Sequence, residues 1–364
     1  MTDKIVERKN KLFQIRDYRS GDEVAICALF EKVFGKPMGK TESLRHWQWE
    51  FLENPVGGLF VKLAWAEEKL VGQYTASPLR VHAAGKEIVA ALSHDTMTDP
   101  EYTGMGIFRK TAEALYDELA DAGHSFIYGF PNRNSIHGFI KNLKWQQVMP
   151  VPVHIRPMGI LKNNTDRLLG RIFQEKKELR RKENEMVLYG VGGYQLKRET
   201  SFGDWADDLW QACCDQHRLW VVRDKKYLNW RYALKPENEY EIISAWKNGN
   251  PVGYVVYLIA DMSFGNTIFV MDFMADLRHP GAANMLINRV IKAAQMHDCS
   301  FASALLTPGS KYLWLFRRRM FLPLPEKLFP QPLYFGVRCF DFSMKSLVAN
   351  PRAWSISWGD NDVI

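Results

Sequence analysis

Long apolar runs are missing from this sequence of 364 residues. No stretch approaches the roughly 20 consecutive apolar residues that a membrane-spanning helix needs. The most apolar segment, VGYVVYLIA at 252–260, has the length of a buried strand. The first ten residues, MTDKIVERKN, contain no apolar segment of the kind found in a secretory signal peptide. We therefore expect a cytoplasmic protein with no membrane partner.

Cysteine is scarce and follows no recognisable pattern. The five cysteines are Cys27, Cys213, Cys214, Cys299 and Cys339. Their number is odd and they form no C-x-x-C pair, so a disulfide framework and a structural zinc site are both disfavoured. We expect reduced thiols and no metal.

Charge of one sign is also not in large excess. The chain has 48 Lys and Arg against 41 Asp and Glu, a net charge of +7. A basic balance attracts nucleic acid, phosphorylated cofactors or sugar nucleotides, but a surplus of this size is equally typical of an ordinary solvated surface. The net charge therefore does not identify a partner.

The chain contains an internal duplication. The segment HWQWEFLENP at 46–55 aligns with YLNWRYALKP at 227–236, an offset of 181 that holds for the Trp, aromatic and Pro positions. The same offset pairs Ala-Trp at 64–65 with 245–246 and Val-Gly at 71–72 with 252–253. A long period with few copies indicates two related domains.

The segment between the two copies differs in composition, since residues 168–199 are first highly charged and then rich in glycine. A solvated basic helix is the preferred interpretation of its charged part, and a nucleic-acid contact is the alternative. We expect a first domain over residues 1–156, a basic linker over 157–200, a second domain over 201–345 and a C-terminal tail over 346–364. For the tail, fraying is the expectation and folding back as a lid is the alternative.

Each copy has the pattern of an α+β domain. In the first copy, residues 21–35 have helical spacing, 59–79 and 81–99 read as strand pairs, and 106–123 form an amphipathic helix that ends at a glycine. A strand, a short helix and another strand follow. This order predicts a mixed, mostly antiparallel sheet flanked by helices, with one central βαβ crossover.

One loop in this pattern is suited to binding phosphate. DPEYTGMGIFRKT at 99–111 follows a long predicted strand and leads into a helix. Backbone N–H groups at a helix N-terminus bind anions, and glycine lets an anion come close to the backbone. Thr103–Phe108 would supply the N–H groups, Gly104 and Gly106 the clearance, and Arg109 added positive charge. A bare turn is the alternative.

This loop resembles the acyl-CoA-binding motif of the GCN5-related N-acyltransferases. The family pattern is (Arg/Gln)-x-x-Gly-x-(Gly/Ala), which Gly106 matches, whereas Thr103 and Phe108 stand in its first and last positions. FIYGFPNRNSIHGFIKNLKW at 126–145 resembles the strand, Asn, helix and final strand of the same family. The resemblance covers most of both copies and implies two tandem domains of this fold. The layout is more narrowly similar to that of two-domain nucleotide-sugar N-acyltransferases of the anthrose-biosynthesis type.

The resemblance implies coenzyme A as co-substrate and names its contacts. The pyrophosphate would lie on the loop, the pantetheine on the end of the preceding strand and beside the Asn residues after the next one. The implied contacts are Met97, Thr98, Thr103, Gly104, Met105, Gly106, Ile107, Phe108, Arg109, Asn132 and Asn134. For Asn134, helix capping is an equally good interpretation. Gly106 aligns with Ala283, so we expect the second copy not to bind coenzyme A.

The implied reaction is attack of an amine on the thioester in a ternary complex, which a base accelerates by ~10²- to 10⁴-fold. Asp95 and His94 are the candidates for that base. Strand alternation places their side chains on opposite faces, so we expect only one to reach the substrate and favour Asp95, with a structural role for His94. The family often has a Tyr near this position that protonates the leaving thiolate. In this sequence the position falls near Ile140, whose side chain cannot donate a proton.

The acceptor rests on the resemblance, which implies the amine of a nucleotide-linked amino deoxysugar and an acetyl or 3-hydroxyacyl donor. An acidic acceptor site would instead favour an aminoglycoside or lysine amine. Two further alternatives are an aminoacyl-tRNA-dependent transferase, which would need a broad basic surface, and a non-catalytic binding protein. We expect no nucleic-acid partner, and the oligomeric state is left open.

Overall fold

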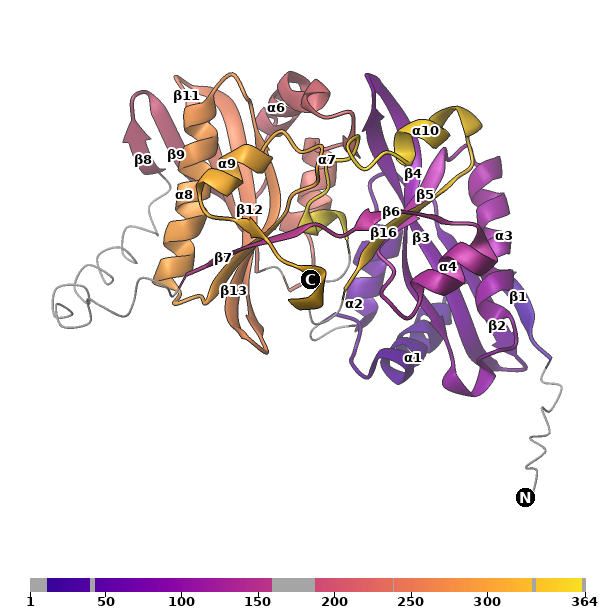
Figure 1. The fold of residues 1–364 in the computed structure, drawn as a ribbon. Helices are drawn as coiled ribbons and strands as arrows, with labels where there is room; N and C mark the ends of the chain where they lie inside the picture. Colours follow the sequence, from indigo (N-terminus) through magenta and orange to yellow (C-terminus); the bar gives the residue numbers. More distant parts are fainter. Residues whose placement is uncertain (1–11, 40–42, 159–186, 238, 329–331, 362–364) are drawn as a thin grey trace.

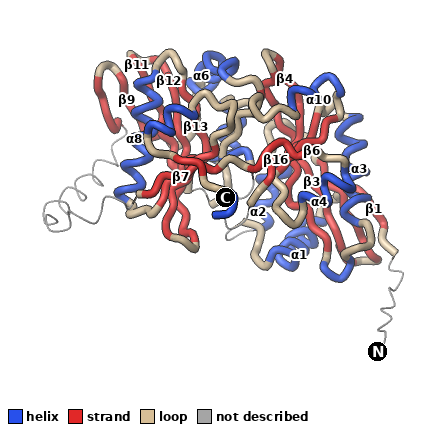
Figure 2. The backbone as a smooth tube through the Cα atoms, in the orientation of Figure 1, coloured by secondary structure: helices blue, strands red, loops and turns tan. Residues whose placement is uncertain are grey.

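The strands of the chain form two mixed sheets that stand side by side, each with helices against it (Figures 1 and 2). The structure is a computed structural model and describes residues 12–39, 43–158, 187–237, 239–328 and 332–361. Within these residues each sheet has eight strands. The α+β class predicted from the sequence is confirmed.

The first sheet has the strand order β1-β2-β3-β4-β5-β16-β6, with β10 paired to β3. Its strands are β1 (Gln14–Asp17), β2 (Phe60–Ala66), β3 (Lys69–Ala83), β4 (Lys86–Thr98), β5 (Phe126–Gly129), β6 (Gln146–Pro150), β10 (Leu219–Val221) and β16 (Tyr334–Cys339). The helices of this half are α1 (Asp22–Phe34), α2 (Ser43–Trp47), the π-helix η1 (Gln48–Leu52), the 3₁₀ turn η2 (Pro100–Tyr102), α3 (Ile107–Asp121) and α4 (Ile136–Leu143). β4 and β5 are parallel and α3 connects them, which is the predicted βαβ crossover.

The second sheet has the order β15-β7-β14-β13-β12-β11-β9-β8. Its strands are β7 (Val153–Pro157), β8 (Val187–Val191), β9 (Tyr194–Glu199), β11 (Glu241–Lys247), β12 (Asn250–Met262), β13 (Gly265–Ala275), β14 (Phe301–Leu305) and β15 (Leu322–Pro323). The helices of this half are α6 (Trp205–Cys213), η5 (Cys214–Gln216), α7 (Lys225–Leu228), the π-helix η6 (Asn229–Ala233), α8 (Pro280–Met296), α9 (Leu313–Arg318) and η7 (Glu326–Leu328). α8 connects the parallel pair β13 and β14 as α3 connects β4 and β5.

The duplicated segments meet at the interface between the two halves. Both form a π-helix, η1 in the first copy and η6 in the second. Trp49 and Trp230, which are equivalent under the offset of 181, stack with their ring centroids 5.3 Å apart. The indole N–H of Trp49 donates to the carbonyl of Trp230 at 2.7 Å, and that of Trp230 donates to the carbonyl of Trp49 at 2.9 Å. This reciprocal contact relates the two copies by an approximate twofold axis.

Each half contributes strands to the other half's sheet, and β10 of the second half pairs with β3 of the first. β16, from the end of the second half, lies between β5 and β6. β7, from the end of the first half, lies between β14 and β15. The sheets therefore do not follow the expected domain boundaries: Val153–Arg156 belongs to the second sheet and Tyr334–Cys339 to the first. The expected linker differs as well, because β8 and β9 are strands of the second sheet, while residues 159–186 lie outside the described residues.

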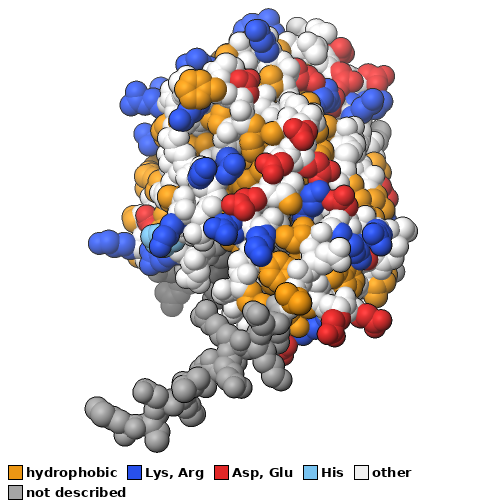
Figure 3. All heavy atoms as spheres, turned by 90° about the vertical axis from the view of Figure 1, so that its right-hand side faces the viewer, with side chains coloured by type: hydrophobic (Ala, Val, Ile, Leu, Met, Phe, Trp, Pro, Cys, Tyr) orange, Lys and Arg blue, Asp and Glu red, His pale blue; other side chains and the backbone are white. Residues whose placement is uncertain are grey.

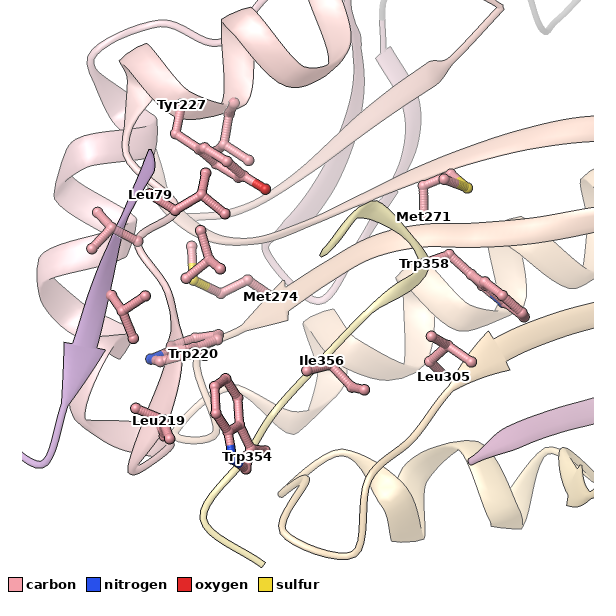
Figure 4. Packing of buried hydrophobic residues seen from close by; sticks show 14 of the residues in the cluster. Leu79, Leu219, Trp220, Tyr227, Met271, Met274, Leu305, Trp354, Ile356 and Trp358 are labelled. Atoms are coloured by element: carbon pink, nitrogen blue, oxygen red, sulfur yellow. The ribbon is translucent and has the colours of Figure 1, made fainter. Parts of the chain in front are cut away.

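The C-terminal tail is folded, contrary to the expectation that it frays. α10 (Lys345–Val348) is followed by Trp354, Ile356 and Trp358, all buried in the largest hydrophobic cluster, which joins the two halves. Figure 4 shows these three side chains among residues of β10, β13 and β14. The tail ends in the 3₁₀ turn η9 (Trp358–Asp360), whose Asp360 pairs with the buried Arg223. Burial of two tryptophans and an ion pair holds the tail in place.

Candidate active site

A cleft opens in the first sheet where two parallel strands separate. β4 and β5 are paired from Ala91 with Ile127 to Ser93 with Gly129, after which β5 ends while β4 continues to Thr98. The last part of β4 is therefore paired only with β3, and its other edge faces a cavity of about 430 Å³. Unpaired strand edges bind extended ligands through backbone hydrogen bonds. The cleft is suited to an extended, amide-containing chain such as pantetheine.

The N-terminus of α3 lies after this strand. Its N-cap is Gly106, with φ 80° and no side-chain cap, and Gly104 has φ 78°. A Cβ atom built on either glycine would meet nothing within 4 Å. The first N–H groups of α3 are thus available beside open space, which is the arrangement that binds an anion. Ile107 itself is buried, so only its backbone can take part.

An ion-pair network fixes the loop before α3. Asp99 has a fully buried side chain that pairs with Lys32 and Lys69 and accepts the N–H of Glu101. Burial by itself raises the pKa of Asp99, but these hydrogen bonds outweigh it and hold that pKa at about 2. The loop entrance is therefore anchored to α1 and β3.

The cleft brings together several of the residues expected to contact coenzyme A. Its lining includes His94, Met97, Thr98, Phe108, Asn132 and Asn134. Thr103, Gly104, Met105, Gly106 and Arg109 lie on the adjoining loop and first turn of α3, and Arg109 is exposed and 4.0 Å from Glu113. Their positions agree with the implied roles, and the roles themselves stay proposals.

Two details of the cleft differ from the expectations. The N-cap of α4 is Ser135, which makes no side-chain cap hydrogen bond, and in the preceding turn Asn132 Oδ1 accepts the N–H groups of Asn134 and Ser135 at 2.9 and 3.1 Å. Sequence reasoning assigned capping to Asn134. It also missed Ser93, Thr96, Gly129, Phe130, Pro131, Ser135, Gly138 and Phe139, which complete the lining. Ile140 is exposed on α4, and its apolar side chain cannot act as a general acid.

A second cavity, of about 490 Å³, lies between the two halves of the molecule. Its walls come from α1, η1, β3 and β4 on one side and from η6, β12 and the C-terminal tail on the other. Titratable groups in its lining are Lys36, His46, Glu50, His94, Asp95, Tyr227, Arg231, Lys235, Glu237, Glu239, Tyr240, Asp261 and Asp360. His94 lines both this cavity and the cleft, so the two spaces meet at that residue.

A bulge in β4 places His94 and Asp95 in the same cavity. Asp95 has φ 47°, and the pairing of β4 with β3 shifts register at this point. The backbone carbonyl of Asp95 accepts Gln73 Nε2 at 3.1 Å, and that of His94 accepts Thr75 Oγ1 at 2.5 Å. The bulge breaks strand alternation. The expectation that the two side chains lie on opposite faces was wrong for this reason, because both line the cavity between the halves.

His94 stands at the centre of a small polar cluster. Its Nδ1 is 3.5 Å from Glu50 Oε1 and 3.5 Å from Asp95 Oδ2, and its Nε2 is 2.7 Å from Ser77 Oγ. Phe51 stacks on the imidazole at a centroid distance of 5.1 Å. Two carboxylates beside an imidazole stabilise its protonated form. The same three groups lie within 4.8 Å of one another and could ligate a cation.

His46 continues this cluster toward the second half. Its Nε2 is 3.8 Å from Glu50 Oε2, and its ring lies against Trp49. Burial, followed by the positive charge of Lys235, lowers the pKa of His46 to about 4. His46 is therefore neutral at pH 7. The sequence analysis did not predict His46 and Glu50 as site residues. The one sequence signal that marks them is the duplicated segment HWQWEFLENP, which contains both.

The corresponding cleft of the second half is nearly closed. Between β13 and β14 there remains a cavity of only about 30 Å³, partly lined by Ser355, Ile356 and Ser357 of the tail. Trp358 Nε1 lies 3.2 Å from Ser303 Oγ on β14. Gly281 is inside α8 here, and no glycine loop precedes that helix. The tail occupies the space in which the first half has its cleft.

Comparison with known proteins finds one matching family model. Residues 14–147 match the family model described as an acetyltransferase (GNAT) domain. No curated protein matches the chain. No helix among the described residues is long and apolar enough to cross a membrane.

Solved structures match nearly the whole chain. A GCN5-related N-acetyltransferase from Anabaena variabilis matches with a TM-score of 0.64 and 12% identity, over 93% of this chain and 75% of that one. A probable N-acyltransferase from Enterococcus faecalis gives 0.61 and 13%, over 91% and 73%. The Saccharomyces cerevisiae N-myristoyltransferase, solved with bound myristoyl-CoA, gives 0.55 and 12%, over 92% and 84%. At these identities the likeness shows the fold.

The family match and the fold agree on the class of enzyme. The matched residues 14–147 contain the cleft, the glycine loop and His94, and the fold implies the use of acyl-CoA. Residues 14–147 thus resemble an acetyltransferase (GNAT) domain, and the whole chain has the fold of solved N-acyltransferases.

Proposed function

We propose that this enzyme transfers an acyl group from coenzyme A, held in the cleft of the first half, to an amine held in the cavity between the halves. The observation that carries the proposal is the position of His94, which lines both spaces. A thioester at the end of the cleft and an amine in the cavity would therefore meet beside one imidazole. Such an arrangement favours direct attack in a ternary complex.

The first half supplies the groups for the acyl donor. The N–H groups at the start of α3, with Gly104 and Gly106 beside them, would receive the pyrophosphate. The unpaired edge of β4 at Met97 and Thr98 would pair with pantetheine, and a backbone N–H there would stabilise the oxyanion of the tetrahedral intermediate.

His94, with Asp95 and Glu50, would move the proton. The amine nitrogen passes a proton to His94 and forms a bond to the thioester carbon; collapse of the intermediate breaks the carbon–sulfur bond and releases the thiolate, which is protonated in turn. The two carboxylates 3.5 Å from Nδ1 stabilise the imidazolium formed on the way. In this scheme His94 replaces Asp95 as the preferred base, and Asp95 orients the ammonium.

A nucleotide-linked amino deoxysugar, with acetyl or 3-hydroxyacyl as the transferred group, is the acceptor we propose. The cavity offers carboxylates at Glu50 and Asp95 for an amine and cations at Arg231 and Lys235 for a diphosphate. An aminoglycoside or lysine amine is the second candidate, because the exposed Glu239 and Asp261 add negative charge to the lining.

The transfer-RNA alternative is less well supported. It would need no phosphate-binding loop, yet the open loop at Gly104 and Gly106 is present. The face of the molecule in Figure 3 carries acidic and basic side chains intermixed, without a broad basic surface.

Release of free coenzyme A tests the proposal. The protein is mixed with acetyl-CoA or 3-hydroxybutyryl-CoA and with a panel of dTDP- and UDP-linked amino sugars, kanamycin and a lysine peptide. Release with a nucleotide sugar supports the first acceptor, and release only with kanamycin or the peptide supports the second. No release with any acceptor, from protein that binds acetyl-CoA, would contradict the choice of acceptor class.

A further inference from the structure

The cavity between the halves is built from equivalent positions that carry opposite charges. Glu50 follows Trp49 on η1, and Arg231 follows Trp230 on η6, at the same offset of 181. Because the two tryptophans stack on each other about the approximate twofold axis, the next residues reach the same cavity from opposite halves. The scaffold is symmetric, whereas its charge is not.

Arg231 and Lys235 place two positive charges on the wall formed by the second half, which also carries Glu237, Glu239, Asp261 and Asp360. Arg231 is buried, and its Nε and Nη2 donate to the carbonyls of Gly359 and Asn361, each at 2.8 Å. Lys235 Nζ lies 3.1 Å from Tyr240 Oη and 5.5 Å from the centre of the Trp49 ring. Burial raises the pKa of Tyr240, but the charges of Arg231 and Lys235 outweigh it and lower that pKa. A phenol whose pKa falls despite burial reports a strongly positive local potential.

Lys235 is free to bind a ligand in a way that Arg231 is not. The guanidinium of Arg231 is already committed to two carbonyls of the tail, which is enough to explain its burial. Lys235 is half-buried in the cavity lining, and no carboxylate of the described residues forms an ion pair with it in the structure. A half-buried ammonium that donates to one phenol oxygen has further N–H donors for an oxyanion.

The wall formed by the first half carries two carboxylates beside the cleft, and Lys36 elsewhere in its lining. Glu50 and Asp95 flank His94 there, and both side chains are mostly buried. Trp49 and the neutral His46 connect the two walls. Trp49 lies beside Lys235, His46 lies beside Glu50, and the two rings contact each other. The cavity therefore has an acidic end at Glu50 and Asp95, beside the cleft, and a basic end at Arg231 and Lys235.

We propose that the cavity recognises an acceptor carrying both an amine and an oxyanion, with the amine at Glu50 and Asp95 and the oxyanion, a phosphate or a carboxylate, at Lys235 with the support of Arg231. This inference rests on the proposed function for the position of the amine. It defines the acceptor class by two charges of opposite sign on one molecule. A cavity of about 490 Å³ has room for such a molecule of the size of a sugar phosphate or a nucleotide sugar.

Matched acceptors test this class. Glucosamine 6-phosphate is compared with glucosamine, UDP-glucosamine with glucosamine, and lysine with lysinamide, so that phosphate and carboxylate are examined separately. We expect the wild type to prefer one anionic member at least tenfold in kcat/KM. We expect Lys235→Met to raise KM for that acceptor at least tenfold with a smaller change in kcat. Lys226→Met, on an exposed lysine of α7, is the matched control.

A binding measurement separates this inference from the proposed function. Titration with UDP, inorganic phosphate and acetate is followed by tryptophan fluorescence, which Trp49 reports from beside Lys235. We expect an oxyanion to bind to the wild type and to Lys226→Met, and at least tenfold more weakly to Lys235→Met. If acyl transfer fails but this difference is present, the basic end is upheld and the transfer reaction is not. Equal binding to Lys235→Met, or no binding to the wild type, would overturn the inference.

Discussion

A negative charge at the N-terminus of α3 should remove the binding of coenzyme A without unfolding the protein. We choose Gly106→Glu, because Gly106 is the N-cap of α3 and a Cβ there meets nothing within 4 Å. A non-glycine residue at φ 80° costs about 1–2 kcal/mol of stability. A carboxylate at a helix N-terminus returns about 0.3–1 kcal/mol of this by its interaction with the dipole. The fold should therefore survive.

The loss of affinity follows from the hydrogen bonds that the carboxylate would take over. A charge-assisted hydrogen bond contributes about 1.5–3 kcal/mol. If two N–H groups of α3 no longer reach the pyrophosphate, about 3–6 kcal/mol of binding free energy is lost, which weakens binding at least ~100-fold. Repulsion between the carboxylate and the phosphates adds to the loss.

Gly123→Glu is the matched control, because it places the same residue after the other end of α3. Gly123 has φ 82°, and a Cβ atom added there would also meet nothing within 4 Å. The control carries the same backbone strain, and its charge is unfavourable to the helix dipole there, so it should be slightly the less stable variant. Calorimetric titration with coenzyme A and thermal unfolding are measured on both. Unchanged affinity in Gly106→Glu, or equal losses in both variants, would refute a phosphate site at α3.

Three further predictions concern catalysis, acid stability and the tail. His94→Gln should lower kcat about 10²-fold and Asp95→Asn at least ~10-fold with coenzyme A binding retained; full-rate variants would remove these groups from proton transfer. Burial, followed by Arg223, lowers the pKa of His217 to about 3, so the unfolded chain takes up its proton first and stability is lost as pH falls from about 6.5. The loss from this group is about 2 kcal/mol between pH 7 and pH 5, and denaturant unfolding of His217→Phe should show a pH dependence smaller by that amount; an unchanged slope would contradict it. Trp358→Ala should cost about 3–5 kcal/mol of unfolding free energy, measured in urea, and a change below 1 kcal/mol would show that the tail is only loosely held.

The local features of the chain were predictable from the sequence. Alternation and helical spacing predicted α1, the strands from 59 to 99, α3, β5, α4 and β6 in order, but not β1, α2 or η1. The glycine loop before a helix was recognised by its residues. The duplication was visible because the segment around Trp49 and Trp230 retained its letters at a fixed offset. Each of these signals is local or repeated, and each involves only a few consecutive residues.

The exchange of β7 and β16 was not predictable in the same way. Both are strands of five or six residues whose own sequences do not say which sheet they join. The choice depends on which neighbouring edge is free once both halves have formed, and that edge lies far away in the chain. The tail illustrates the same point, because Trp354, Trp358 and Asp360 find their partners in strands and loops far earlier in the chain.

The sequence by itself determined the α+β class, the presence of two related copies and the position of a glycine loop before a helix in one of them. It did so because periodicity, glycine placement and repeated letters are properties of short segments. Only the tertiary structure decided which side chains line the cleft and the cavity. A bulge at Asp95 lets two successive side chains, His94 and Asp95, line the same cavity. Packing of Trp49 on Trp230 brings Glu50 and Arg231, which are 181 residues apart in the chain, to that cavity as well. Such juxtapositions arise from backbone geometry and long-range packing, which no short stretch of the chain encodes.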